Sequence, residues 1–173
     1  MNKLDKNTKN KLHFWWFIAA MICAITPYYH MKVKATNNYE TILQTAANNC
    51  NLGVVKLLVK DIVPELNETA LHFAARGGCL DTIRFLILEE KVNIDAPDKY
   101  AFKRTALHNA TYEGKLEIIR FLLEKGANPN VRDTNGHSPR KVAVLRSRHN
   151  KDKPYREIIK LLANAEEQYK SGK

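Results

Sequence analysis

Cysteine is scarce in this sequence, which has only Cys23, Cys50 and Cys79 in 173 residues. Three cysteines are too few for the disulfide framework of a small secreted domain, and none stands in the C-x-x-C spacing of zinc and thiol redox sites. Glycine-rich phosphate loops, H-E-x-x-H helices and G-x-S-x-G turns are also missing from the sequence. The sequence therefore predicts no metal, no cofactor and no catalytic residues, and it favours a non-enzymatic protein.

Acidic residues are in the minority, and the chain carries a formal net charge of +10. The excess lies at the two ends: residues 1–34 hold 6 basic and 1 acidic residues, residues 140–173 hold 10 and 4, and residues 35–139 hold 12 and 13. A basic surface is a common signature of nucleic-acid binding. Because the middle of this chain is neutral, nucleic acid is not the expected partner of its main body.

Only one long hydrophobic run is present, and it lies near the amino terminus. Residues 1–11 form a lysine-rich tail, residues 12–30 hold the apolar run, and residues 31–37 form a linker. Residues 12–29 have about the length of a short membrane span, and Trp15, Trp16, Tyr28 and Tyr29 stand at its ends, where interfacial aromatics lie. The run also suits a signal peptide, although no small-x-small cleavage site follows at once. A buried soluble helix is the third alternative.

Lysines predict the orientation of this segment. Lys3, Lys6, Lys9 and Lys11 precede it, whereas Lys32 and Lys34 follow it. The positive-inside rule then keeps the amino end in the cytoplasm. We expect a single-pass membrane protein with its main body on the non-cytoplasmic side, or a secreted or periplasmic protein whose mature chain begins between about Thr26 and Thr36.

The main body of the chain repeats itself. Residues 69–86 begin with Thr-Ala-Leu-His-Phe-Ala and end with Ile-Arg-Phe-Leu, and residues 105–122 begin with Thr-Ala-Leu-His-Asn-Ala and end with the same four residues. Each copy contains two apolar segments of helical periodicity separated by a glycine turn. Residues 41–58 and 138–162 are weaker copies, and a polar segment splits the last one.

This unit resembles the ankyrin repeat, whose usual wording is T-P-L-H-x-A-A within about 33 residues. The resemblance covers residues 37–165 and implies an all-α solenoid of helix-turn-helix units with β-hairpin-like fingers, preceded by one hydrophobic helix. The repeats are predicted at residues 38–67, 68–103, 104–136 and 137–165, in a domain of residues 38–169, and residues 166–173 are predicted to be a polar tail. The outer copies are irregular, as terminal repeats are, because one side of each meets solvent.

The connectors between the copies differ in length from the family norm. The connector after Lys60 is short, so the finger between the first and second copies is predicted to be missing. Residues 92–104 are predicted to form an enlarged finger with aromatic and basic residues, and residues 126–137 are close to the family wording.

Two kinds of polar residue receive structural roles. His72 and His108 occupy the T-x-L-H position, where the resemblance implies a hydrogen bond between loops and not a metal or catalytic site. Thr69, Thr105 and Ser138 are predicted to cap the first helices with their side-chain oxygens.

Function must then come from the surface. Ankyrin repeats generally bind other proteins through finger tips and the concave face of the first helices, so the resemblance implies a monomeric protein–protein interaction module with an unknown protein partner. The predicted binding residues are Asn48, Arg76, Lys99, Tyr100, Phe102, Lys103, Tyr112 and Glu113, with Asn49 and Gly77 at neighbouring free positions. Tyrosine and arginine often dominate interfaces. Alternatively, Tyr100 and Phe102 pack back on the longer finger.

The fourth copy contains a basic loop, residues 146–154, with Arg146, Arg148, Lys151 and Lys153. This loop is either a solvated segment or a site for a polyanion, such as nucleic acid or an anionic lipid. Cys50 and Cys79 fall at neighbouring positions of adjacent turns. We expect both to be free thiols, because stacked helices lie about 10 Å apart, beyond disulfide reach.

Overall fold

The computed structural model describes residues 38–62, 66–99 and 102–172. The tail, hydrophobic segment and linker predicted for residues 1–37 lie outside the described residues, as does Tyr100. The chain divides into two compact units, Met1–Tyr39 and Glu40–Lys173. The second unit holds the repeats.

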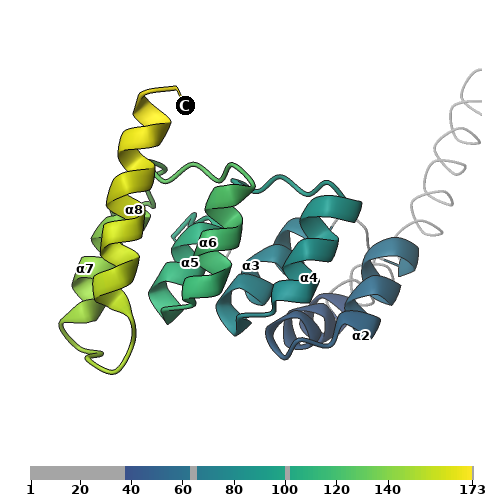
Figure 1. Cartoon of the computed structure of the whole chain (residues 1–173). Helices are drawn as coiled ribbons and strands as arrows, with labels where there is room; N and C mark the ends of the chain where they lie inside the picture. The colour runs from purple at the N-terminus through teal and green to yellow at the C-terminus, as the bar shows by residue number, and fades with distance from the viewer. Residues whose placement is uncertain (1–37, 63–65, 100–101, 173) are drawn as a thin grey trace, which may run out of the picture. The chain divides into compact units, whose positions relative to one another are not determined.

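Four pairs of helices stand side by side in this second unit (Figure 1). The first pair is the helix of residues 38–48 and α2 (Leu52–Leu57), which continues as the π-helical turn η1 (Leu58–Ile62). The others are α3 (Asn67–Gly77) with α4 (Leu80–Arg84) and its π-helical continuation η3 (Phe85–Glu89), α5 (Ala106–Glu113) with α6 (Leu116–Glu124), and α7 (Pro139–Ser147) with α8 (Tyr155–Lys170). The part of the chain that the structure describes contains no strand, and the predicted all-α solenoid is confirmed.

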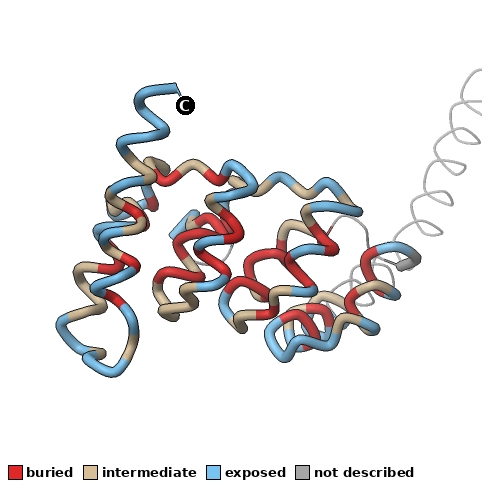
Figure 2. Tube along the Cα trace, viewed as in Figure 1, coloured by how far each residue is buried: buried red, intermediate tan, exposed pale blue. Residues whose placement is uncertain are grey.

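The core lies between successive pairs. The first helices α3, α5 and α7 pack in a row, and α6 packs against α8. Leu71 and Leu107, from the two Thr-Ala-Leu-His segments, are fully buried, and burial of each leucine stabilises the fold by about 1.5–3 kcal/mol. Figure 2 shows that buried residues line the helix faces that meet a neighbouring pair, while exposed residues lie on the outer faces and the loops.

The turns within the pairs need a left-handed residue. Gly78 and Gly114 end α3 and α5 with φ angles of 87° and 72°, a conformation that glycine adopts without steric cost. The first copy has Cys50 at the corresponding position, with a φ of 60°. The first copy therefore has a cysteine side chain at the position where the second and third copies have glycine.

Helix starts follow the predictions in two of three cases. Thr105 is the N-cap of α5 and forms a capping box with His108, and the Ser138 hydroxyl accepts a hydrogen bond from the Lys141 amide at the start of α7. The prediction for Thr69 is wrong, because α3 begins at Asn67 and places Thr69 inside its first turn. Only residues 63–66 separate the end of η1 at Ile62 from the start of α3 at Asn67.

The two fingers lie against each other and share hydrogen bonds. The Asp95 carboxylate accepts from the Asn128 amide at 3.0 Å, and the Phe102 carbonyl accepts from the Thr134 amide at 2.9 Å. Phe102 and Lys103 have positive φ angles of 56° and 50°, so the enlarged finger includes a left-handed turn. At the far end, α8 continues to Lys170, past the predicted end of the fourth repeat at residue 165.

No helix within residues 38–62, 66–99 and 102–172 is both long enough and apolar enough to cross a bilayer.

Candidate partner-binding groove

Equivalent residues of the first helices form two rows. Asn48, Arg76 and Tyr112 occupy corresponding positions in the first three copies, and Thr45, Phe73 and Asn109 stand three residues earlier. Residues three apart on a helix lie on the same face. Stacking the copies therefore brings residues that are distant in sequence into one continuous surface.

Two adjoining pockets open on this surface. The pocket between the second and third copies has a volume of about 210 Å³ and is lined by His72, Phe73, Arg76, Asp98, Arg104, Asn109, Tyr112 and Glu113. Its neighbour has a volume of about 350 Å³ and is lined by Gln44, Thr45, Asn48, Asn49, Phe73 and Arg76. Because Phe73 and Arg76 line both pockets, we treat the two as one feature, the groove.

The chemistry of the groove is polar. Gln44, Asn48, Asn49 and Asn109 contribute amide groups, each of which both donates and accepts hydrogen bonds. Aromatic side chains, Phe73 among them, add flat apolar surface. Such a lining suits the alternating donors and acceptors of an extended peptide backbone better than a purely apolar molecule.

Arg76 is the exposed cation at the centre of the groove. Its side chain is 61% exposed, and its Nε atom lies 3.8 Å from the Glu113 carboxylate. Lys153 lies 3.6 Å from the same carboxylate and donates to the Glu113 backbone carbonyl at 2.7 Å. Exposed ion pairs contribute about 0–1 kcal/mol, so Arg76 can exchange Glu113 for a partner's acceptor at little cost.

Rings and guanidinium groups form a stack beside the groove. The Arg104 Cζ atom lies 5.1 Å from the centroid of the Phe102 ring and 5.0 Å from that of the Tyr112 ring, and the Arg146 Cζ atom lies 4.0 Å from the Tyr112 centroid. The Tyr155 hydroxyl donates to the Tyr112 backbone carbonyl at 2.7 Å. The stack thus joins the enlarged finger to the third and fourth copies and fixes Tyr112.

A buried carboxylate holds Arg104 in this stack. The Asp133 side chain is fully buried, and its Oδ2 atom lies 3.4 Å from the Arg104 Nε. Burial opposes the negative charge of Asp133, but hydrogen bonds from the His137 and Asn135 amides, together with Arg104, outweigh burial and lower the pKa of Asp133 below its usual value.

His108 is a neutral structural residue. Its Nε2 atom lies 3.0 Å from the His137 backbone carbonyl, and its Nδ1 atom accepts a hydrogen bond from the Thr105 amide at 3.3 Å. These partners require the proton on Nε2. Burial is the main cause that lowers the pKa of His108. The predicted bond between loops is confirmed at this position.

His72 differs from His108. The residue is 3% exposed, and neither ring nitrogen has a hydrogen-bond partner within the described residues. The Ala96 backbone is close enough to raise the pKa of His72, but the pair does not meet hydrogen-bond geometry. Burial lowers the pKa more than Asp98, Glu68 and Ala96 raise it. The predicted bond between loops is therefore not formed by His72.

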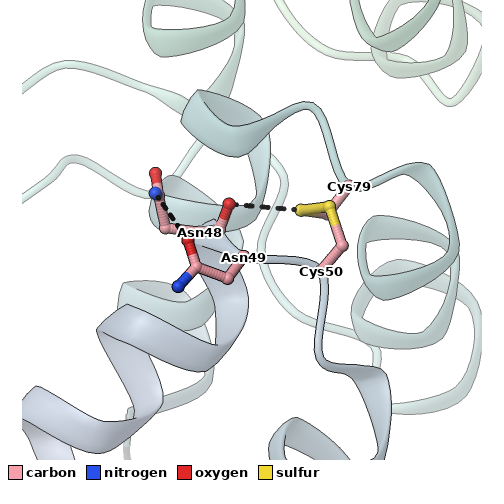
Figure 3. Close-up of a disulfide and its surroundings, with 4 residues drawn as sticks. All are labelled: Asn48, Asn49, Cys50 and Cys79. Carbon is pink, nitrogen blue, oxygen red and sulfur yellow. Dashed lines mark hydrogen bonds between the residues drawn. A yellow bond between two sulfur atoms is a disulfide. The ribbon is translucent and has the colours of Figure 1, made fainter.

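The first two copies are joined by a disulfide between Cys50 and Cys79 (Figure 3). Our prediction of free thiols is wrong: the Cα atoms lie 4.9 Å apart, well inside disulfide reach. The spacing of about 10 Å between stacked helix axes does not give the distance between these cysteines, because they lie in turns, and the two turns approach each other more closely than the helix axes do. The Cys79 sulfur also lies 3.6 Å from the Asn48 carbonyl oxygen, which is a contact and not a hydrogen bond while the sulfur is oxidised.

Comparison with known families agrees with this architecture. The family model described as ankyrin repeats (3 copies) matches residues 16–98 and 88–171. The chain belongs to the ankyrin-repeat family. No curated protein sequence matches it significantly.

The ankyrin fold brings some predicted binding residues together and leaves others apart. Arg76, Tyr112 and Glu113 line one pocket, and Asn48 lines its neighbour. Lys99, Phe102 and Lys103 are exposed on the enlarged finger outside the two linings. Phe102 is 54% exposed while its ring contacts Arg104, and Tyr100 lies outside the described residues.

Sequence reasoning missed several residues that line the groove. Phe73 and Asn109 stand at the one position that differs between Thr-Ala-Leu-His-Phe-Ala and Thr-Ala-Leu-His-Asn-Ala, so the variable position of the ankyrin motif was an available signal. Asp98 and Arg104 come from the finger, and no local pattern places them beside the helices.

The basic loop of the fourth ankyrin repeat is partly engaged inside the molecule. Arg146 donates to the Tyr112 carbonyl and contacts its ring, and Lys153 donates to the Glu113 carbonyl. Arg148 and Lys151 are exposed. Two of the four predicted polyanion contacts are thus used for packing, which weakens the polyanion alternative.

Proposed function

We propose that this ankyrin-repeat protein is a non-enzymatic interaction module that holds an extended segment of a partner protein in the groove. Asn48, Arg76, Tyr112 and Glu113 would contact that segment, and Lys99, Tyr100, Phe102 and Lys103 would contact the partner from the enlarged finger. The observation that carries the proposal is the row of equivalent positions 48, 76 and 112, which lies along two adjoining pockets.

Energetics support this assignment. Tyr112 is fixed by Arg104 and Arg146 before any partner binds, so little conformational entropy remains to be lost at that side chain. Arg76 is exposed and only weakly paired. A fixed aromatic beside an available arginine is a typical interface hot spot.

Peptide display tests the proposal. Peptides selected on the full-length protein in detergent micelles are titrated against it by fluorescence anisotropy. We expect Arg76→Ala to weaken binding about tenfold or more, because truncation of a hot-spot arginine usually costs over about 1 kcal/mol. Arg156→Ala, at an exposed position of α8, is the matched control. Equal effects of the two substitutions would place the peptide outside the groove.

We further infer that the repeats lie on the non-cytoplasmic side of a membrane, tethered by residues 12–29 or released after signal cleavage. The Cys50–Cys79 disulfide supports this inference, because disulfides persist in oxidising compartments and are rare in the cytosol. Blocking free thiols in intact cells, before lysis and reduction, tests it. Cys50 and Cys79 should take up a second label only after reduction; labelling in the first step would indicate a reducing compartment.

A further inference from the structure

The disulfide stands next to one wall of the groove. Asn48 and Asn49, which line that wall, directly precede Cys50, and Figure 3 shows both asparagines beside the joined sulfurs. The other half of the bond, Cys79, is buried at the start of α4. The covalent link therefore ties the Asn48 wall to the repeat that carries Phe73 and Arg76.

The first repeat is a terminal repeat, so it packs against a neighbour in the solenoid on one side only. Its ion pairs to the second repeat, Lys56–Glu89 at 3.9 Å and Lys60–Glu90 at 3.8 Å, involve lysine side chains that are 44% and 49% exposed, and such pairs contribute little. Both lysines also lie over the Phe85 ring. The third and fourth repeats, in contrast, share the Arg146 and Tyr155 bonds to the Tyr112 carbonyl.

The approach of the two turns is close and conformationally costly. A Cβ atom at Gly77 would lie 2.1 Å from the Asn48 carbonyl oxygen, so the second turn fits against Asn48 only as glycine. Cys50 holds a φ of 60°, which a residue with a side chain adopts at a cost of about 1–2 kcal/mol. The disulfide is a covalent constraint on both features.

We propose that the disulfide is a redox latch that holds the Asn48–Asn49 wall of the groove in its binding position. The proposal rests on the proposed function of the groove. A dithiol reductant opens the latch. One of its thiolates attacks the sulfur of Cys50, which is the exposed partner, and forms a mixed disulfide with it. The Cys50–Cys79 bond breaks, and Cys79 leaves as a thiolate that takes a proton. The second dithiol sulfur then displaces Cys50, so the reductant becomes a disulfide and two cysteine thiols remain.

Hydrogen exchange tests the latch directly. The full chain with Cys23→Ser, in detergent micelles, is compared with and without dithiothreitol. We expect amides of residues 40–57 to exchange about tenfold faster or more after reduction, because loss of a disulfide commonly removes more than 1.4 kcal/mol of stability. Amides of residues 106–124 should change less than about twofold. Unchanged exchange in residues 40–57 would overturn the latch.

The variant with Cys50→Ser and Cys79→Ser separates loss of the bond from other effects of the reductant. It should exchange like the reduced protein and should not respond to dithiothreitol. If this variant does not fold, reoxidation of the reduced Cys23→Ser chain replaces it, and slow exchange should return.

Titration of a display-selected peptide separates the latch from the function of the groove. Binding should weaken about tenfold after reduction, equivalent to 1.4 kcal/mol. Equal affinity in both states would refute redox control and leave groove binding intact. If no peptide binds the oxidised protein, the proposed function fails, while hydrogen exchange still decides whether the disulfide holds the first repeat.

Discussion

Arg104 is the residue at which three parts of the molecule meet. Its guanidinium group contacts both the Phe102 and the Tyr112 ring and pairs with the buried Asp133 carboxylate. Removing the arginine would leave Asp133 buried with only its backbone donors. The contribution of this residue is therefore structural.

We expect Arg104→Ala to lower the free energy of unfolding by about 2–4 kcal/mol, because it breaks a buried ion pair and two ring contacts. Urea unfolding monitored by circular dichroism measures this loss. Arg132→Ala is the control: its side chain lies on the next finger and donates to the Gly136 carbonyl at an exposed site, so a change below about 1 kcal/mol is expected. Similar losses of unfolding free energy in the two variants would show that the contacts around Arg104 do not stabilise the fold.

His108 gives the fold a dependence on pH. Burial lowers its folded pKa below the usual 6.5, whereas the unfolded chain keeps the usual value. As the pH falls, the unfolded state therefore binds the proton before the folded state does. The contribution of neutral His108 to the free energy of unfolding is complete above about pH 6.5 and is lost progressively between pH 6.5 and the folded pKa.

We expect the free energy of unfolding to fall as the pH is lowered from 7.5 to 5.5, at up to about 1.4 kcal/mol per pH unit for each such histidine. Burial lowers the pKa of His72 in the same direction. His108→Asn should flatten part of the slope. A slope identical to that of the parent protein would mean that His108 does not titrate on unfolding.

At the scale of the helices, the repeated leucines test the register of the stack. Leu107 of α5 is fully buried between repeats, and Leu107→Ala should lower the free energy of unfolding by about 2–5 kcal/mol. Leu88→Ala, at a position 43% exposed in η3, should cost less than about 1 kcal/mol. Chemical denaturation of both variants provides the comparison, and a small effect at Leu107 would contradict the repeat register.

Gly77 and Gly53 form a contrasting pair of helical glycines. Gly77→Ala should destabilise the first repeat by about 1–3 kcal/mol, because the new Cβ atom would meet the Asn48 backbone at 2.1 Å. Gly53→Ala, whose nearest neighbour lies 3.7 Å away at Asn51 Oδ1, should stabilise α2 by about 0.5–1 kcal/mol. Thermal unfolding measures the stability of both variants. Stability changes of the same sign would contradict the close contact between Gly77 and the Asn48 backbone.

At the scale of the whole molecule, the proposed anchor or signal at residues 12–29 would determine the compartment in which the repeats lie. If residues 12–29 are an anchor, the protein in cells keeps its Met1 end and stays in the membrane pellet through high-salt and alkaline washing, because salt strips charge-held proteins and not spanning helices. Protease added from the non-cytoplasmic side should digest the repeats. Amino-terminal sequencing provides the decisive measurement: a mature terminus between about Thr26 and Thr36 would refute the anchor and favour signal cleavage.

The sequence by itself determined the architecture of the repeats. The Thr-Ala-Leu-His segments, the glycine turns and the apolar periodicity specify helix pairs, and helix pairs that cannot bury their apolar faces alone must stack. The same register placed Asn48, Arg76 and Tyr112 at equivalent positions. These features depend on local helix propensity and on the spacing of apolar residues, and both can be determined from the amino-acid sequence alone.

Tertiary structure alone decided how the stacked turns and fingers meet. The Cys50–Cys79 disulfide, the Arg104 stack and the finger side of the groove all join residues far apart in the chain. The average helix spacing wrongly predicted that the cysteines were too distant, because a glycine at position 77 lets one turn approach the Asn48 backbone. Such contacts depend on shifts of a few ångströms between repeats, which the repeat period does not contain.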